Sequence, residues 1–218
     1  MHYIYKYNSE HMIKNYFRHS LLVVFFIIAN SDVWGQAWDF AKEEDGIKIF
    51  TRNQKNSSLK SYRGEMLLHA PFQKVCSMFG NANNLDWWGP DFKSIKVLAY
   101  VPGKYVQFYY IYDMPWPLTD RDLAVNVTVK KDTLTGEYSF LSTPLLNVIP
   151  EKPNLVRIKK YSQKWTVRPL EKGNVLVILE GFVDPDVPDW LYNMLVAEMP
   201  VRTMRLLRER VLSGKPAK

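Results

Sequence analysis

The chain has few of the side chains that carry out redox, metal and nucleophilic chemistry. It has one cysteine, Cys76, among 218 residues, so no disulfide can form within it. Val75, Met78 and Phe79 surround this cysteine in the sequence, which predicts a buried thiol. Of the four histidines, only His69 follows the N-terminal segment. We therefore expect no Cys/His metal site and no His-dependent nucleophile, while a carboxylate-only metal site stays open.

Glycine-rich loops and basic tracts are also missing. The ten glycines form no phosphate-binding loop and no dinucleotide fingerprint, so we expect no cofactor and no catalytic residue. The net charge of +7 comes from dispersed lysines and arginines, which argues against a nucleic-acid partner. Modest basicity fits a transient contact with an anionic membrane surface, and equally a soluble monomer without one.

The N-terminal segment has the pattern of a secretory signal. Two basic residues precede the apolar run of residues 21–29, and small residues follow it. This run is shorter than the roughly 20 residues that span a bilayer, so an N-terminal membrane anchor is the alternative. We predict a signal peptide over residues 1–35, with Met12 as an alternative start. The mature protein is then exported to the periplasm or the cell exterior.

The rest of the chain is rich in aromatic residues, with 7 Trp, 13 Tyr and 11 Phe. Aromatic rings bury much area per residue, and the length suggests one large domain with room for a cavity. We place this domain at residues 36–213 and predict a disordered tail over residues 214–218.

The other elements are organised around residues 114–122. Pro115 and Pro117 fix two backbone angles and remove two donors, so residues 114–118 are neither helix nor central strand. Residues 123–131 then alternate between aliphatic and polar side chains, which predicts a half-buried strand. The same parity places Arg121 on the apolar face, either as a buried group that needs partners or as a side chain that reaches the rim.

The elements predicted on either side of this stretch indicate an α+β fold. We expect a helical turn at 38–44, strands at 47–51 and 59–69, a helix at 70–80, and a helical turn or loop at 81–86. Further strands are expected at 95–101, 105–112, 123–131, 138–140, 156–167 and 175–183, with a loop at 143–154. A final helix at 188–212 should kink at Pro200. No parallel crossover is expected, so a curved antiparallel sheet wraps around the last helix.

With this order of elements, the chain resembles a START-type lipid-binding domain of the helix-grip superfamily, in a secreted, bacterial-style form. The resemblance covers residues 38–212, and the proline–aromatic box at 115–122 is its most specific part. The matching segments are Trp38 with Asp45-Gly46-Ile47, Tyr62-Arg63-Gly64, Pro115-Trp116-Pro117 with Asp120-Arg121-Asp122, Val156-Arg157 with Trp165-Thr166-Val167-Arg168-Pro169, and Val187-Pro188-Asp189-Trp190-Leu191.

The resemblance implies a helix-grip fold in which a U-shaped sheet and a long C-terminal helix enclose a tunnel for one lipid or sterol-like molecule. By position, Arg121 would be the polar group inside that tunnel. The gate would be formed by the proline loop, that is by Met114, Pro115, Trp116, Pro117 and Leu118.

A buried arginine needs a counter-charge. Glu198 falls on the apolar stripe of the last helix and is one candidate partner for Arg121; Glu180 and Asp113 are others. The alternative is that Glu198 points to water beside Arg202.

Several apolar or aromatic residues are candidates for the tunnel wall, with ordinary core packing as the alternative for each. They are Trp87, Trp88, Tyr109, Ile111, Trp116, Leu123, Val125, Phe140, Trp165, Trp190 and Met194.

The function expected from this reasoning is a carrier or sensor that binds one hydrophobic ligand without catalysis. One alternative is an acid–base enzyme of the cyclase or hydrolase type that uses Arg, Tyr and carboxylate groups in the same cavity. A strongly perturbed carboxylate beside Arg121, in a roomy pocket that water can enter, would favour the enzyme. Another alternative is an interaction module whose interior is filled by its own side chains.

Overall fold

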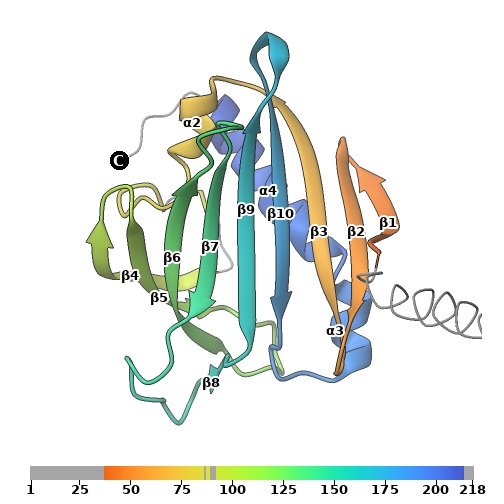
Figure 1. The fold of residues 1–218 in the computed structure, drawn as a ribbon. Coiled ribbons are helices and arrows are strands. Elements are labelled where there is room, and N and C mark those ends of the chain that lie inside the picture. Colours follow the sequence, from red (N-terminus) through yellow and green to blue (C-terminus); the bar gives the residue numbers. More distant parts are fainter. Residues whose placement is uncertain (1–36, 86, 89–91, 214–218) are drawn as a thin grey trace, which may run out of the picture. The chain divides into compact units, whose positions relative to one another are not determined.

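The computed structural model describes residues 37–85, 87–88 and 92–213 (Figure 1). The predicted signal peptide and C-terminal tail lie outside these residues. Residues from Trp38 onward form a compact unit of their own, and the description below concerns this unit.

Its main element is a ten-stranded sheet with the strand order β1-β2-β3-β10-β9-β7-β6-β5-β4, in which β8 pairs with β6 outside this path. All pairs are antiparallel except the short parallel pairing of β8 with β6. The strands are β1 (Asp39–Glu44), β2 (Ile47–Gln54), β3 (Ser57–His69), β4 (Phe92–Val101), β5 (Tyr105–Tyr112), β6 (Arg121–Lys131), β7 (Tyr138–Pro144), β8 (Val156–Arg157), β9 (Tyr161–Pro169) and β10 (Asn174–Val183).

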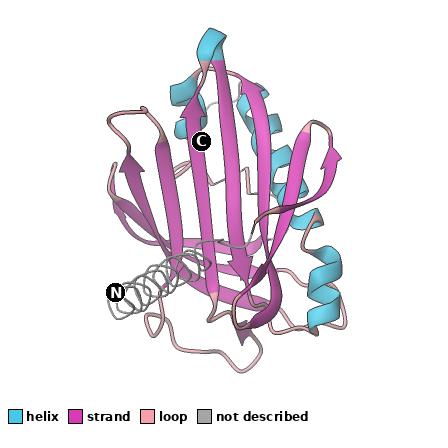
Figure 2. Ribbon diagram, turned by 45° about the vertical axis from the view of Figure 1, so that its right-hand side comes forward, coloured by secondary structure: helices cyan, strands magenta, loops and turns pink. Residues whose placement is uncertain are grey.

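The described helices are α2 (Phe72–Cys76), the 3-10 turn η1 (Glu171–Gly173), α3 (Asp189–Leu195) and α4 (Glu198–Leu212). Helix α4 crosses one face of the curved sheet and contacts β2 and β3 (Figures 1 and 2). Gly64 of β3 permits this approach, since a Cβ atom there would lie 2.4 Å from the sulfur of Met204. Among the described residues, no helix has both the length and the apolar character needed to cross a bilayer.

The strand register defines which residues share the face that α4 covers, which we call the inner face. Directly paired residues on neighbouring strands point to the same side of a sheet. Starting from Gly64, this parity selects Leu179, Trp165, Phe140 and Val129 in one row. The next row, which we call the middle row, contains Tyr62, Gly181, Gln163, Ser142, Val127 and Val106.

The opposite side of the sheet, the outer face, carries charged side chains in its central part. Arg63 lies 2.7 Å from Glu180 and 2.6 Å from Glu65 in ion pairs across β3 and β10. Inner apolar and outer charged residues therefore alternate along these strands, as expected for an antiparallel sheet with one face packed on the core.

The predicted helical turn at 38–44 is wrong, because this segment is strand β1. Its residues pair with β2 from Asp39 to Glu44, and Phe40 packs edge-on against Phe50 at 5.8 Å between ring centroids. Pairing with β2 provides hydrogen-bond partners for the backbone of this segment, whereas a single isolated turn of helix is not stable.

The last helix is divided just before Pro200, as predicted. Val196 and Ala197 separate α3 from α4, and Pro200 lies in the first turn of α4. Pro200 has no N–H group to donate to the carbonyl oxygen of Val196, so a continuous helix would lack this hydrogen bond. A proline is tolerated in the first turn because the first N–H groups of a helix have no partner within the helix.

Two other predicted elements differ in extent. Residues 156–167 are not one strand, since residues 158–160 separate β8 from β9 and β8 pairs in parallel with β6. The predicted helix at 70–80 is limited to Phe72–Cys76.

Candidate functional site

The Asp120-Arg121-Asp122 box lies at the start of β6, and each of its three charged side chains holds a different segment. The carboxylate of Asp120 accepts hydrogen bonds from Lys93 Nζ at 2.7 Å and from the backbone N–H of Met114 at 3.2 Å. The hydrogen bond from Lys93 is the main cause of the lowered pKa of Asp120. Asp120 therefore closes the proline loop of residues 113–120 against β4.

Arg121 is buried, with 4% of its surface exposed, and its partners are backbone carbonyl groups. Its guanidinium donates to the carbonyl oxygens of Pro185 and Asp186, each at 2.9 Å, and to that of Thr119. These bonds fasten the segment before α3 to the start of β6.

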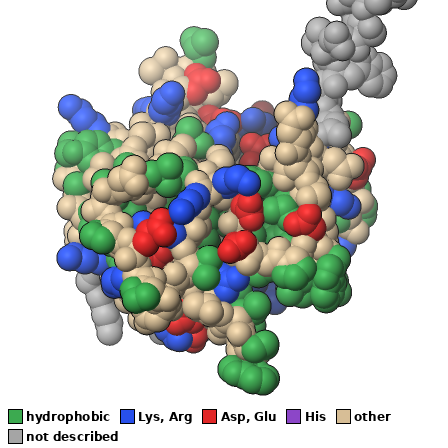
Figure 3. All heavy atoms as spheres, turned by 90° about the horizontal axis from the view of Figure 1, so that it is seen from below, with side chains coloured by type: hydrophobic (Ala, Val, Ile, Leu, Met, Phe, Trp, Pro, Cys, Tyr) green, Lys and Arg blue, Asp and Glu red, His purple; other side chains and the backbone are tan. Residues whose placement is uncertain are grey.

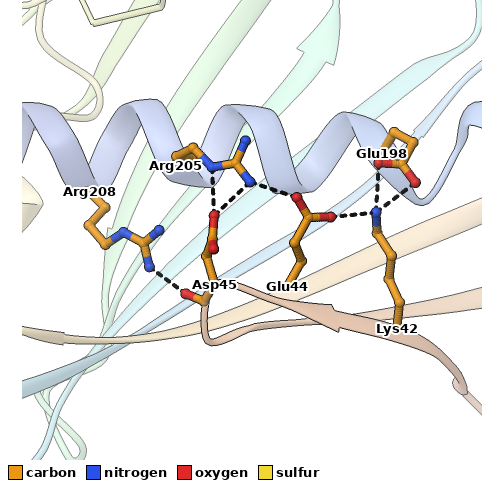
Figure 4. A network of polar contacts seen from close by, with 6 residues as sticks. All are labelled: Lys42, Glu44, Asp45, Glu198, Arg205 and Arg208. Atoms are coloured by element: carbon orange, nitrogen blue, oxygen red, sulfur yellow. Dashed lines mark hydrogen bonds and ion pairs between the residues drawn. The ribbon is translucent and has the colours of Figure 1, made fainter.

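Glu198, one of the candidate partners, does not pair with Arg121. Glu198 begins α4, and its carboxylate oxygens both lie 2.6 Å from Nζ of Lys42 on β1 (Figure 4). The N–H groups of Arg121 instead donate hydrogen bonds to backbone carbonyl oxygens. The other proposed partner Glu180 pairs with Arg63 on the outer face, and Asp113 pairs with Lys93.

Asp122 forms a buried ion pair with Arg157 of β8, whose Nε lies 2.7 Å from the carboxylate. The hydroxyl of Tyr109 also donates to Asp122 at 2.7 Å. Burial opposes ionisation of Asp122, but the bonds from Arg157 and Tyr109 outweigh it and lower the pKa of Asp122. Burial and the nearby carboxylate raise the pKa of Tyr109 to about 12.

The register of β5 against β6 places Tyr109 and Ile111 on the outer face, together with Asp122. Tyr109 is opposite Ala124 and Ile111 is opposite Asp122, whereas Leu123 and Val125 belong to the inner face. The prediction that Tyr109 and Ile111 line the same wall as Leu123 is therefore wrong, because successive residues of a strand point to opposite faces.

The structure brings most of the other predicted wall residues together on or against the inner face. Trp87 lies 6.0 Å from Trp88 and from Trp165, measured between ring centroids. Phe79 joins them at 4.8 Å from Trp165 and 5.0 Å from Phe140. Leu123 and Val125 belong to the same core cluster.

Sequence reasoning missed several aromatic members of this cluster. Phe79 had been assigned only to the end of a helix. Phe108 and Tyr110 pack against Trp88 at 5.4 and 5.6 Å. The alternation along β5 was the signal that could have separated them from Tyr109.

Three predicted wall residues lie on the surface instead. Trp116 is 93% exposed, Trp190 is 69% exposed and Met194 is 61% exposed. Their assignment to the wall is wrong in this structure, because Trp116 stands at the tip of the proline loop and α3 presents Trp190 and Met194 to solvent. The proline loop and α3 lie at the same end of the sheet as β8 (Figure 1), and Figure 3 shows hydrophobic groups exposed at that end.

The inner face also carries polar groups that the sequence reasoning did not single out. In the middle row, Gln163 donates to the hydroxyl of Tyr62 and accepts from Trp165 Nε1, both at 3.3 Å. The buried Ser142 hydroxyl interacts with the phenol groups of Tyr110 and Tyr161, whereas Nε1 of Trp88 is buried without a hydrogen-bond partner among the described residues. A serine at an inward position of β7 was the available sequence signal.

A polar network fixes α4 to the hairpin of β1 and β2. Arg205 lies 2.7 Å from both Glu44 and Asp45, and Arg208 donates to the carbonyl oxygen of Asp45 at 2.6 Å (Figure 4). Lys42 continues this network to Glu44 and Glu198, so the helix is held over the inner face at this edge.

Comparison with known proteins identifies solved structures that share this fold. No family model matches the chain. An uncharacterized protein of Pseudomonas aeruginosa is 29% identical over 173 residues, which cover 78% of this chain and 85% of the relative. The solved structure of a STAR-related lipid transfer protein from Xanthomonas axonopodis is 29% identical, covers 80% of this chain and 98% of its own, and has a TM-score of 0.73.

Human StAR-related lipid transfer protein 5 shares the fold at 16% identity and a TM-score of 0.72, with 89% of this chain and 94% of that chain covered. The described unit of this chain has the α+β helix-grip fold that these START-type structures share.

Proposed function

We propose that this domain binds one hydrophobic molecule, a lipid or sterol-like ligand, between the inner face and α4, and acts as a carrier or sensor without catalysing a reaction. The names of two structural neighbours, from Xanthomonas axonopodis and from human, describe lipid transfer proteins, which supports a ligand of this class.

The observation that carries the proposal is the character of the inner face. In the described part of the sheet, the rows through Gly64 and Ser142 contain only uncharged residues, and aromatic rings gather beside them. Ligand sites of this kind are mostly apolar, with a few polar groups that orient the ligand. Each square ångström of apolar ligand surface removed from water contributes about 25 cal/mol.

Asp120 and Asp122 flank Arg121, and the pKa of each carboxyl group is lowered. This supports the carrier, most clearly at the buried Asp122. Its pKa is lowered rather than raised, and its oxygens bind Arg157 and Tyr109 on the outer face. A general acid needs the opposite shift and access to the ligand.

Photo-crosslinking tests where the ligand binds. The protein is incubated with vesicles that contain a diazirine derivative of cholesterol or of phosphatidylcholine, irradiated and digested. We expect adducts on inner-face segments of β5, β7 and β9 and on α4. Adducts confined to the outer face, or none with either lipid, would count against the proposal.

We further propose that the end of the domain formed by the proline loop and α3 contacts membranes during exchange. The exposed aromatic residues Trp116 and Trp190 support this, since tryptophan favours the membrane interface. The net charge of +7 adds attraction to anionic lipids. Exchange then requires the proline loop and α3 to move apart, as lids do in other proteins.

Vesicle sedimentation measures binding to membranes, and a lipid-transfer assay between vesicles measures the rate of exchange. The double variant Trp116→Ala/Trp190→Ala should lower binding to anionic vesicles and the transfer rate by about tenfold, because each ring supplies interfacial contact area. Its affinity for ligand in solution should not change. Leu134→Ala is the control, since Leu134 is 95% exposed but lies on the turn between β6 and β7. Equal losses in both variants would contradict the proposed orientation.

We also propose export of the mature protein, on the basis of the charged, apolar and small-residue order of the N-terminal segment. Cell fractionation with an N-terminal sequence of the isolated protein tests this. A start near residue 36 in the periplasmic or extracellular fraction is expected, and an intact N-terminus in the cytoplasm would contradict it.

A further inference from the structure

We infer that Lys93 of β4 is a latch that keeps the proline loop of residues 113–120 closed, and that it thereby sets the rate at which the ligand enters and leaves. The latch consists of the ammonium group of Lys93 and the carboxylates of Asp113 and Asp120. This inference rests on the proposed function, because it concerns the exchange of ligand at the same site.

Helix α3 is firmly attached to β3. The hydroxyl of Tyr192, a residue that is 3% exposed, donates to the carbonyl oxygen of Lys60 at 3.0 Å. The side chain of Asn193 accepts from the backbone N–H of Lys60 at 3.0 Å and donates to the carbonyl oxygen of Ser58 at 2.8 Å. The buried Arg121 also holds the segment before α3. When the proline loop and α3 move apart, the proline loop is therefore the part that moves.

The proline loop has few backbone ties to its surroundings. Pro115 and Pro117 have no N–H group to donate, and the N–H of Leu118 donates to the carbonyl oxygen of Pro115 within the loop. In the described part of the chain, no backbone hydrogen bond joins residues 113–118 to another element. Side-chain contacts therefore hold the loop closed.

Lys93 contacts both ends of this loop. Its Nζ atom lies 2.9 Å from a carboxylate oxygen of Asp113, where the loop begins, and 2.7 Å from one of Asp120, where the loop ends. The other carboxylate oxygen of Asp120 accepts the backbone N–H of Met114 at 3.2 Å. One side chain of β4 thus fastens the two ends of the loop together and to the sheet.

The latch is held by charge, but it is exposed to solvent. Hydrogen bonds with Asp120 and Asp113 raise the pKa of Lys93, and the bond from Lys93 lowers the pKa of Asp120, so Lys93 and Asp120 are both charged at neutral pH. About half of the surface of Lys93 and of Asp113 is exposed. Exposed ion pairs are weak and are screened by salt. A weak attachment suits a loop that must open in each round of exchange.

Spin labels at Trp116→Cys and Met194→Cys measure opening without any ligand, through the distance between the proline loop and α3 in pulsed electron paramagnetic resonance. Both positions are exposed, and the native Cys76 is buried and stays unlabelled. We expect Lys93→Met to raise the fraction of molecules at longer distances about threefold to tenfold, the usual effect of losing weak ion pairs. About 1 M salt should have the same effect on the wild type and little effect on Lys93→Met.

Fluorescent NBD derivatives of cholesterol and phosphatidylcholine measure exchange. Entry and exit pass the same loop, so Lys93→Met should speed loading from vesicles and release by the same factor and leave the Kd unchanged. Asp113→Asn should have a smaller effect, because Asp120 still binds Lys93.

Lys96→Met is the matched control. Lys96 is an exposed residue of the same strand and forms no ion pair with the described residues, so its loss changes the net charge equally and leaves the latch intact. We expect this variant to behave as the wild type in both experiments.

The outcomes separate the latch from the proposed function. Equal distances in Lys93→Met and Lys96→Met, or rates of loading and release that do not rise when the loop opens, overturn the latch while the carrier stands. A weaker Kd with unchanged loading would assign Lys93 to ligand binding and also overturn it. If neither lipid binds and the photo-crosslinkable lipids label nothing, the proposed function fails, and the role of Lys93 in exchange fails with it.

Discussion

At the scale of single residues, the buried ion pair of Asp122 and Arg157 is the contact whose loss should cost most. The two side chains are 1% and 5% exposed. Asp122→Asn leaves a buried guanidinium without its counter-charge, and we expect it to lower the free energy of unfolding by about 3 to 5 kcal/mol in urea titrations. Asp120→Asn, at the more exposed pair with Lys93, should lower the free energy of unfolding far less, because solvent screens that pair. Similar costs for the two variants would contradict this ranking.

The same carboxylate predicts how stability depends on pH. Because the folded-state pKa of Asp122 lies below its ordinary value, its ionised form stabilises the fold above the unfolded-state pKa of about 3.9. This contribution disappears as pH falls from there through the folded-state pKa. The stability difference between the wild type and Asp122→Asn, measured by urea unfolding from pH 7 to pH 3, should therefore narrow toward low pH. A constant difference would show that Asp122 is not ionised in the fold.

Residue-level prediction from the sequence succeeded where strand parity decided the outcome. The alternation along residues 123–131 correctly placed Leu123 and Val125 in the core and predicted that Arg121 shares their face. Sequence reasoning did not identify the ion-pair partners of charged residues. Glu198 was a candidate partner of Arg121 because it falls on the apolar stripe of the last helix, but the stripe contains no information about Lys42 of β1, with which Glu198 pairs. Ser142 was missed because its contacts with Tyr110 and Tyr161 join residues far apart in the sequence.

At the scale of elements, α4 depends on the hairpin of β1 and β2. Glu44→Gln removes the charge that binds Lys42 and Arg205, so β1 should open more often. We expect faster amide hydrogen exchange in β1, and a similar effect of high salt on the wild type, because salt screens such exposed pairs. Glu43→Gln, on the exposed side of β1, is the control. Unchanged exchange in Glu44→Gln would show that backbone pairing alone holds β1.

Element type was predictable wherever a long segment had one period. The strands corresponding to β3, β5, β6 and β10 and the final helical region were found from alternation or from a helical stripe. The short segment 38–44 was assigned wrongly, because its identity as a strand depends on pairing with β2. The break between α3 and α4 was predictable from Pro200, because a proline removes the hydrogen bond to the residue four positions earlier, here Val196.

At the scale of the whole domain, the sheet and the helix together form a feature that neither has alone. This feature is an uncharged face of the sheet that α4 covers and that also carries buried polar groups. Filling this face should remove binding without removing the fold. Val127 is an inner-face residue of β6, and its neighbour Thr128 lies on the outer face. Val127→Trp and Thr128→Trp thus add the same ring on opposite sides of one strand.

The most direct test is native mass spectrometry of the protein purified from its own host, with identification of any bound mass. We predict one hydrophobic molecule per chain in the wild type and in Thr128→Trp, and none in Val127→Trp, with circular dichroism confirming that all three are folded. A wild-type protein that stays ligand-free after incubation with total lipid extract, or a Val127→Trp variant that keeps the ligand, would contradict binding on the inner face.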